Sequence, residues 1–325
     1  MQFVNRLFGK KQISLGIVGL SFLTKGISIA ISKYNESNEL RLVHCEFIAT
    51  DQPPDLTVAL AGLFQLYPLE RFDCHLVLTL DNYRHINIEA PPVADNELAE
   101  AIRWKIQDLI DFPVDKAVID YFSTPPTGRV NSGKSLDIIA SPLDTIKHQV
   151  ELCQKANLNL KVIDIQETSL RNLAALLPEN DRGVAILYLQ DSNGMIILQK
   201  QATIYLSRKF NTGIDKLGLN INTSDNDRAQ SEQSSLALEI QRSLDYVESV
   251  YGIPPFSGLA VIPIAQNTQR LLEILNDHHG ITARIMDLST ILDSDIMLDD
   301  LTQSLCAPVI GATWRYTVEK LCSSK

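Results

Sequence analysis

The sequence predicts an α/β protein of two domains, and three observations lead to this fold class. The chain has 325 residues, which is more than one hydrophobic core of ordinary size requires. Each half begins with strand-like runs and continues with alternating helix and strand patterns, as mixed α/β sheets do. A polar stretch at 179–183 separates the halves. We therefore expect one domain at 1–181 and a second at 182–325.

Composition and charge are those of an ordinary globular protein and argue against a general nucleic-acid binder. Hydrophobic residues make up 45% of the chain and charged residues 21%. The formal net charge is −10 at pH 7, whereas a nucleic-acid binder needs a basic face to displace phosphate counterions. The five cysteines and six histidines lack the spacing of a disulfide framework or a metal site. We expect no nucleic-acid partner, no metal, and free buried thiols in a reducing compartment.

The apolar stretch 13–32 predicts a β-hairpin instead of a membrane anchor. A spanning helix needs about 20 apolar residues, and Lys25 near its centre would cost roughly 3 kcal/mol in the bilayer. The stretch also lacks the small-residue cleavage site of a signal peptide. Its residue pattern predicts strands at 13–20 and 26–32, joined by a turn at 21–25. We therefore expect a cytoplasmic protein.

Helix and strand patterns alternate through the rest of the first half. The helix at 96–110 has the clearest pattern, because Asp95 can cap it and Ile102 belongs to an apolar stripe. Ser141 and Pro142 are typical of the start of the next helix, as cap and first residue. The other expected elements are strands at 40–49, 75–80, 84–88, 117–122, 136–140 and 160–165, and helices at 56–66, 141–155 and 168–177.

The second half repeats this order of elements. The turn at 191–194, with the sequence Asp-Ser-Asn-Gly, is typical of a hairpin. The polar segment 221–233 predicts a loop, and an apolar stripe predicts a long helix at 234–251. The other expected elements are strands at 184–189, 195–199, 203–207, 259–263 and 282–286, and helices at 267–275 and 308–321.

The segment 128–135 matches the phosphate-binding pattern G-x-x-x-x-G-K-S by letter, but its context predicts a polar loop. That site needs a helix beginning at the lysine, so that free N–H groups face the phosphates. Residues 136–140, which follow Lys134, predict a strand instead. No spacing typical of a catalytic nucleophile and its base occurs. Asp164 and Glu167, near a strand end, are interpreted as solvated loop or helix-cap residues, so we expect no catalytic residue.

Four stretches resemble, in their order and spacing, the PilM-like proteins of the actin-like ATPase superfamily, which act in type IV pilus assembly. They are LGI at 15–17, APPVADNELAEAIRWKIQDLIDFPVDKAVIDY at 90–121, LEIQRSLDYVESVYG at 238–252 and APVIGATWRY at 307–316. The resemblance covers essentially the whole chain. It implies an actin-like, ribonuclease H-like fold of two α/β domains, with a small inserted subdomain at about 83–135 and a final helix that packs back onto the first domain.

The resemblance also implies a partner and a groove. PilM-like proteins are cytoplasmic and bind the short N-terminal tail of a PilN-like bitopic inner-membrane protein, which connects them to other components of the assembly platform. In the family the tail lies between the main first domain and its insert. This would place the groove near Asn96, Ile102 and Lys105. The oligomeric state stays open, a homodimer included.

The nucleotide cleft that the resemblance implies is degraded in this chain. Nucleotide-binding members have Asp-x-Gly in the first phosphate turn, where this chain has Val18 and Leu20. Val18 offers no oxygen to a hydrated magnesium ion, and Leu20 adds bulk where the backbone should approach phosphate. The second phosphate hairpin has lost Asp-x-Gly as well, and the paired glycines of the adenosine motif are replaced at 264–266. The cleft residues that remain are Gly16, Ser21, Lys25, Asp191 and Gly194.

We therefore expect a non-catalytic scaffold without a bound cofactor. The alternative is a divergent ATPase that still holds ATP and magnesium in the cleft through Ser21, Lys25 and backbone groups. A third reading is a sugar-kinase-like enzyme of the same superfamily, although this sequence lacks the catalytic aspartate of such enzymes.

Overall fold

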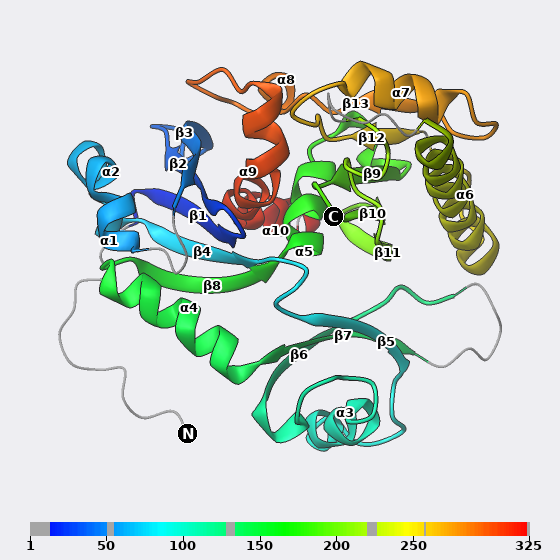
Figure 1. Cartoon of the computed structure of the whole chain (residues 1–325). Coiled ribbons are helices and arrows are strands. Elements are labelled where there is room, and N and C mark those ends of the chain that lie inside the picture. Colours follow the sequence, from blue (N-terminus) through cyan, green and yellow to red (C-terminus); the bar gives the residue numbers. More distant parts are fainter. Residues whose placement is uncertain (1–13, 51–54, 128–133, 220–225, 257, 324–325) are drawn as a thin grey trace.

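Two five-stranded sheets with the same topology form the body of the computed structural model, which describes residues 14–50, 55–127, 134–219, 226–256 and 258–323 (Figure 1). The first sheet has the strand order β3-β2-β1-β4-β8 and the second β11-β10-β9-β12-β13. In each sheet the first three strands along the chain pair antiparallel, and two further strands extend the sheet in parallel. This repeated topology confirms the predicted actin-like fold class.

The first sheet contains the predicted N-terminal hairpin. Its strands stay paired as far as Leu23 and Gly26, so the turn consists of Thr24 and Lys25 alone and is shorter than expected. A Cβ at Gly26 would lie 2.2 Å from the backbone oxygen of Ile48, which explains the glycine. The strands are β1 (Gly16–Leu23), β2 (Gly26–Tyr34), β3 (Leu40–Ala49), β4 (Asp73–Leu78) and β8 (Asn159–Ile165).

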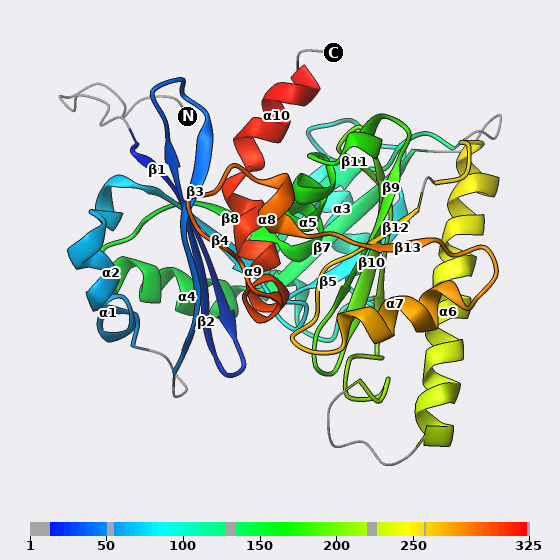
Figure 2. The same ribbon diagram turned by 90° about the horizontal axis from the view of Figure 1, so that it is seen from above.

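Three helices cover one face of this sheet (Figure 2). The single helix expected at 56–66 is broken at Leu60. The backbone of Leu60 is not helical, and its side chain packs into the core beneath. Val18 and Leu20 of β1 enter the same core. The helices are α1 (Leu56–Ala59), α2 (Ala61–Leu66) and α4 (Leu143–Lys155), and a 3₁₀ turn, η1 (Leu69–Arg71), precedes β4.

The second sheet has its helices on the outer face, away from the first sheet (Figure 2). The prediction of a loop at 221–233 is wrong from Asn226 onward, because the long helix already begins there. The polar sequence is helical there because Ala229 and Leu236 are buried on one side while the polar residues face water. The elements are β9 (Val184–Leu189), β10 (Gly194–Lys200), β11 (Thr203–Phe210), α6 (Asn226–Tyr251), β12 (Leu259–Val261), α7 (Thr268–Asn276), β13 (Ala283–Ile285) and η3 (Pro178–Asp181).

A third, small sheet with the order β5-β7-β6 stands apart from the body and carries one helix on its far face (Figure 1). Asp95 does not cap that helix, because Glu97 occupies the cap position. Ser141 caps nothing either, since its strand continues through Pro142 and its hydroxyl donates to the Asn82 carbonyl. The domain boundaries stay predictions. The elements are β5 (Arg84–Glu89), α3 (Leu98–Ile106), η2 (Val114–Lys116), β6 (Ala117–Ser123) and β7 (Ser135–Pro142).

Helices α5 (Gln166–Ala174) and α9 (Asp300–Thr313) lie between the large sheets and touch each other closely (Figure 2). A Cβ at Gly311 would lie 2.1 Å from the backbone oxygen of Ser169, so only glycine permits this approach. The single helix expected at 308–321 is two helices, because α9 ends at Thr313 and α10 (Arg315–Ser323) follows. The first of them also begins earlier than expected, because the Asp299 carboxylate caps it, and Pro308 lies inside it. No helix among the described residues has the length and apolar character needed to cross a bilayer. Helix α8 (Leu288–Ile291) precedes α9 in the chain.

Candidate functional site

A groove of about 600 Å³ runs between the small sheet and the body of the protein, and we call it the insert groove. Strands β6 and β7 form one wall, and β8, α5 and α10 form the other. Its lining side chains are Leu78, Val118, Asp120, Tyr121, Phe122, Ser123, Ile139, Ser141, Ile146, Ile163, Asp164, Ile165, Thr168, Arg171, Ala202, Thr203, Ile204, Arg315 and Glu319.

Strand β6 is an edge strand beside this groove. Within the described residues it pairs with β7 alone. The neighbours Asp120, Tyr121 and Phe122 all line the groove, although successive side chains of a strand point to opposite faces. The groove therefore follows the edge of the sheet and not one face. Such an edge can offer backbone N–H and C=O groups to another extended chain.

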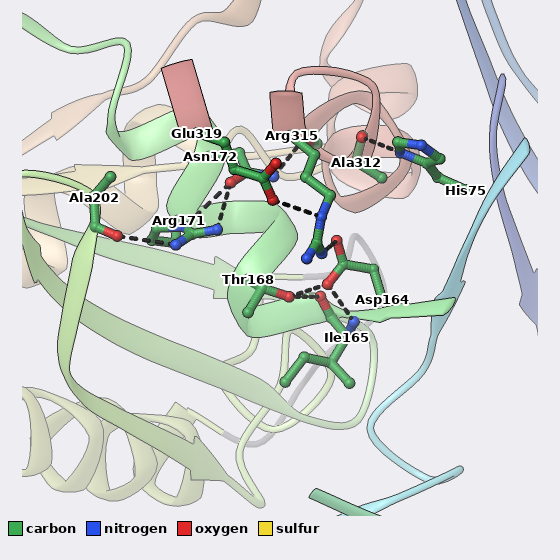
Figure 3. Close-up of polar contacts among 11 residues, drawn as sticks. His75, Asp164, Ile165, Thr168, Arg171, Asn172, Ala202, Ala312, Arg315 and Glu319 are labelled. Atoms are coloured by element: carbon green, nitrogen blue, oxygen red, sulfur yellow. Dashed lines mark hydrogen bonds and ion pairs between the residues drawn. The ribbon is translucent and has the colours of Figure 1, made fainter. Parts of the chain in front are cut away.

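Asp164, at the end of β8, is the central charged residue of the groove wall (Figure 3). Its Oδ2 accepts a hydrogen bond from Nη1 of Arg315 at 2.9 Å, and its Oδ1 accepts from the Ile165 nitrogen and the Thr168 hydroxyl. Burial alone would lower the pKa of Arg315, but the Asp164 carboxylate outweighs burial, and the pKa lies above its ordinary value. One buried carboxylate thus joins the start of α5 to the start of α10.

Arg171 connects α5 to the second sheet at the same wall (Figure 3). Its Nη1 donates to the Ala202 carbonyl at 3.0 Å, and its Nε and Nη2 donate to Oδ1 of Asn172. The Asn172 side chain in turn donates to the Gly311 carbonyl of α9 at 3.0 Å. These bonds hold the guanidinium group in a defined place at the groove wall.

A second hollow, of about 390 Å³, lies between the β1–β2 turn and the β9–β10 turn, and we call it the interdomain cleft. Lys25 Nζ and Asp191 Oδ2 lie 3.0 Å apart and bridge the two turns. A second bridge of 3.4 Å joins Lys209 to Asp81. The hydrogen bond to Asp191 raises the pKa of Lys25. Part of the lining is apolar, and it consists of Leu23, Phe47, Leu80, Leu301 and Leu305.

Comparison with protein families classifies the chain. The family described as type IV pilus assembly protein PilM matches residues 82–287, which is more than half of the sequence. The chain belongs to the PilM family. No curated protein matches it.

One solved structure agrees with this classification at the level of the fold, and two others have lower similarity. A chain of the "PilM-PilN type IV pilus biogenesis complex" is similar at a TM-score of 0.68 and 18% identity, and the match covers 93% of this chain and 98% of that one. A Bacteroides thetaiotaomicron protein with an actin-like ATPase fold and unknown function matches at 0.49 and 11%, covering 86% and 94%. The cytoplasmic domain of EpsL, from the Vibrio cholerae type II secretion system, matches at 0.47 and 13%, covering 76% and 81%.

Of the residues expected in the nucleotide cleft of this PilM-family chain, Lys25 and Asp191 line the interdomain cleft. Ser21 does not, because it is buried within β1 and its hydroxyl donates to the Val77 carbonyl at 2.8 Å. The reason is the hairpin register. Since β1 and β2 remain paired as far as Leu23, the turn lies beyond Ser21.

The two glycines expected in that cleft have structural roles. Gly16 lies at the opposite end of β1, where a Cβ would come within 2.0 Å of the Ser32 oxygen. Gly194 begins β10, and a Cβ there would meet the Leu189 side chain at 2.4 Å. Both positions require glycine for strand packing, and neither lines the cleft.

The structure agrees only in part with the effects predicted for Val18, for Leu20 and for the segment after β12. Val18 supplies no carboxylate, but Leu20 does not crowd the cleft, because its side chain enters the core beneath α1. After β12, Ile262 and Ile264 are buried. The hydroxyl of Thr268 bonds the Ile264 carbonyl at 3.0 Å. Side chains thus fill the segment where the resemblance expects paired glycines.

The residues expected at the partner groove, Asn96, Ile102 and Lys105, do not line the insert groove. Ile102 is buried in the core between α3 and the small sheet. Lys105 donates from Nζ to the Glu89 carbonyl at 2.6 Å, and Asn96 lies exposed before α3. Helix α3 covers the far face of the small sheet (Figure 1), whereas the lining of the insert groove includes residues of β6 and none of α3. The expected contact of Asn96, Ile102 and Lys105 with a partner stays a prediction.

Sequence reasoning missed the charged residues of the groove. Asp164 lines the groove and Glu167 does not, but for both the solvated-loop interpretation is wrong, because both side chains are buried. The helix-cap interpretation of Asp164 is correct in part, since it bonds the Ile165 nitrogen at the start of α5. The sequence did contain a signal for a buried ion pair, namely a carboxylate at the end of an apolar strand, because a buried carboxylate needs a partner. Of the segment 128–135, residues 128–133 lie outside the described residues, and the strand expected at 136–140 begins one residue earlier, at Ser135.

Proposed function

We propose that this PilM-family protein is a non-catalytic scaffold of a type IV pilus assembly platform, and that the insert groove holds the N-terminal tail of a PilN-like inner-membrane protein. The observation that carries the proposal is the edge of β6 opposite the Asp164–Arg315 pair. The similar structure described as a PilM–PilN complex supports a partner of this kind. We infer a place on the cytoplasmic side, attached to the inner membrane through that partner and other platform components.

The chemistry of the groove suits a short extended peptide. An added strand gains affinity from main-chain hydrogen bonds to β6 and specificity from its alternate side chains. Val118 and Ile163, on opposite walls, are 38% and 39% exposed and offer apolar contacts. Arg171 and Arg315 stand among Asp120 and other acids and offer charged contacts to polar residues of the tail. A groove of about 600 Å³ has the size of a ligand site and can hold a few residues.

Peptide binding tests this proposal. We would measure fluorescence anisotropy of a labelled synthetic peptide that has the sequence of the cytoplasmic tail of the PilN-like protein encoded beside this chain. Saturable binding to the full-length protein, with loss of affinity on changes in the insert groove, is the expected result. If the intact protein binds no such tail, the proposal fails.

We propose further that the chain holds no nucleotide and catalyses no reaction. A magnesium ion needs carboxylate-type ligands near the phosphates, but Val18, at the position of the family's aspartate, supplies none and lies in the core. The carboxylates that line the cleft, Asp81 and Asp191, are each paired with a lysine. The β1–β2 turn is too short to surround a phosphate, since it holds only Thr24 and Lys25. Lys25 is bonded to Asp191 across the cleft, so a phosphate would compete with a carboxylate for this cation.

Calorimetric titration with ATP and Mg²⁺ separates the scaffold from the alternative of a divergent ATPase. We expect no binding heat and no phosphate release, with Lys25→Ala indistinguishable from the wild type. Tight binding with measurable hydrolysis would contradict the non-catalytic assignment, and it would leave the tail-binding proposal to its own test.

We infer a narrower assignment within the family, to MshI of a mannose-sensitive haemagglutinin (MSHA) pilus. The order and spacing of the four stretches at 15–17, 90–121, 238–252 and 307–316 support it. The test compares tail peptides from an MSHA-type partner and from the PilN-like protein of another type IV pilus. Preference for the MSHA-type tail is expected, and equal or reversed affinities would argue against the assignment.

A further inference from the structure

The face of the small sheet that points toward α5 is buried and polar. Ile88 and Ile138, on β5 and β7, pack against α3 in the small sheet's own core. Side chains alternate along a strand, so His85 of β5 and Asp137 of β7 point to the opposite face of the small sheet, where Glu167 of α5 lies. The small sheet is thus held against the body at this point by charged groups, which fix an orientation more strictly than an apolar surface does.

The contacts of this cluster cross from the small sheet to the body. His85 Nε2 lies 3.1 Å from Asp137 Oδ1, and His85 Nδ1 lies 3.3 Å from Glu167 Oε1. The Tyr83 hydroxyl donates to the second oxygen of Glu167. The Asn87 amide donates to Asp137 at 3.0 Å. The imidazole and both carboxylates are at most 17% exposed, so solvent screens them little.

His85 is an imidazolium at neutral pH. Burial lowers its pKa, but the hydrogen bonds to Asp137 and Glu167 outweigh burial and raise the pKa to about 10. Burial and the Glu167 charge raise the pKa of Tyr83 well above its ordinary value, so the phenol stays neutral. The groups that face His85 are therefore one carboxylate from β7, one from α5, and the Phe122 ring of β6 at 6.2 Å between ring centroids.

The cluster joins two elements that form opposite walls of the insert groove, β7 and α5, although His85, Asp137 and Glu167 do not themselves line it. Phe122 and Ile139, next to His85 on the small sheet, line one wall, and Thr168, next to Glu167 on α5, lines the other. We propose that His85 is a positioning residue: by joining Asp137 of β7 to Glu167 of α5, it fixes the separation of the groove walls and thereby the affinity for an extended peptide. The last clause rests on the proposed function of the groove.

A first test needs no peptide. Hydrogen–deuterium exchange of the full-length His85→Gln variant should be faster in β6 and at the start of α5, and unchanged in α3, whose core is separate. The matched control is His44→Gln, because His44 also faces a carboxylate, that of Glu46 at 3.1 Å, but far from the groove. Unchanged exchange in β6 and α5 of His85→Gln would overturn the inference.

The charge on His85 gives a second readout that a merely space-filling residue would not. Histidine ¹⁵N spectra at pH 8 should show both ring nitrogens of His85 protonated. The Glu167→Gln variant should have a lower pKa at His85 than the wild type. A neutral His85 at pH 8 contradicts the proposal. The double variant His85→Gln/Glu167→Gln replaces the ion pair by two amides that can bond each other. It should return the exchange in β6 toward the wild-type rate, whereas persistent fast exchange would count against a role through this pair.

The tail peptide described above completes the test. His85→Gln should weaken its binding about tenfold, which corresponds to about 1.4 kcal/mol, and His44→Gln should leave it unchanged. If exchange responds but affinity does not, the groove width is not set by His85 and the proposal fails. If the wild type binds no tail, the proposed function fails, while the exchange and titration results still decide whether His85 positions the walls.

Discussion

Asp164 and Arg315 lie 151 positions apart in the sequence and form an ion pair of 2.9 Å at the wall of the insert groove. The side chain of Asp164 is 3% exposed and that of Arg315 29% exposed. The pair therefore sits at the border between the core and the groove. It holds the start of α10 against the end of β8, so it shapes the site and stabilises the fold at once.

Replacing Asp164 by asparagine should destabilise the protein by about 2 kcal/mol, because Arg315 loses its buried carboxylate partner and keeps Glu319, and because the cap of α5 weakens. Urea unfolding followed by circular dichroism measures the change. Arg41→Gln is the matched control, since Arg41 pairs with Asp293 and Asp295 where all three side chains are about half exposed, and its loss should leave stability close to the wild type. A larger effect at Arg41 than at Asp164 would contradict this account.

Gly311→Ala should destabilise the protein by more than about 2 kcal/mol, since the new methyl group would overlap the Ser169 carbonyl where α9 crosses α5. Gly62→Ala provides the contrast. No heavy atom lies within 4 Å of a Cβ there, and alanine favours the helix, so stability should rise by up to about 1 kcal/mol. Thermal unfolding of both variants checks the prediction, and equal shifts would show that the helix crossing tolerates the extra atom.

Ile163→Glu should weaken binding of the tail peptide by at least about tenfold, because it places a charge among the apolar contacts of the insert groove. Val58→Glu makes a comparable change on α1, where the side chain is exposed and does not line the groove. Anisotropy titrations of the two variants and the wild type provide the measurement. Similar affinities for the two variants would exclude the insert groove as the binding site.

The stability of the protein should fall on the acid side through His75. Burial lowers the pKa of this histidine, and its Nδ1 donates to the Ala312 carbonyl at 2.8 Å, which a neutral imidazole can do (Figure 3). The unfolded chain therefore binds more protons than the folded one once the pH drops below about 6.5. Denaturant midpoints should decline less steeply between pH 7 and pH 5 in His75→Gln than in the wild type. Parallel profiles would refute the assignment.

His85 acts in the opposite direction. Its folded pKa of about 10 lies above the ordinary value of 6.5, so its contribution is complete below about pH 6.5 and disappears as the pH rises through about 10. The difference in unfolding free energy between the wild type and His85→Gln should therefore shrink from pH 8 to pH 10.5. A constant difference over this range would mean that the histidine is not charged in the folded protein.

The sequence alone determined the elements whose evidence is local. Alternation in β2 and the charge of Lys25 were enough to predict the N-terminal hairpin, and β3 begins and ends where expected. The similar order of elements in the two halves predicted two α/β domains with mixed sheets, and the structure shows that the two sheets share one topology. These inferences succeed because the period of a pattern reports directly which face of a strand or helix is buried.

The tertiary structure decided the ends of elements and the location of the site. Ser141 remains in a strand because its hydroxyl finds the Asn82 carbonyl, and α6 begins at Asn226 because a neighbouring sheet buries one side of a polar stretch. The groove follows β6 and not α3, and its charged groups pair across long separations in the sequence, as Asp164 and Arg315 do. A buried charge is stable only beside a partner from another element, and no local pattern in a single sequence records which element that will be.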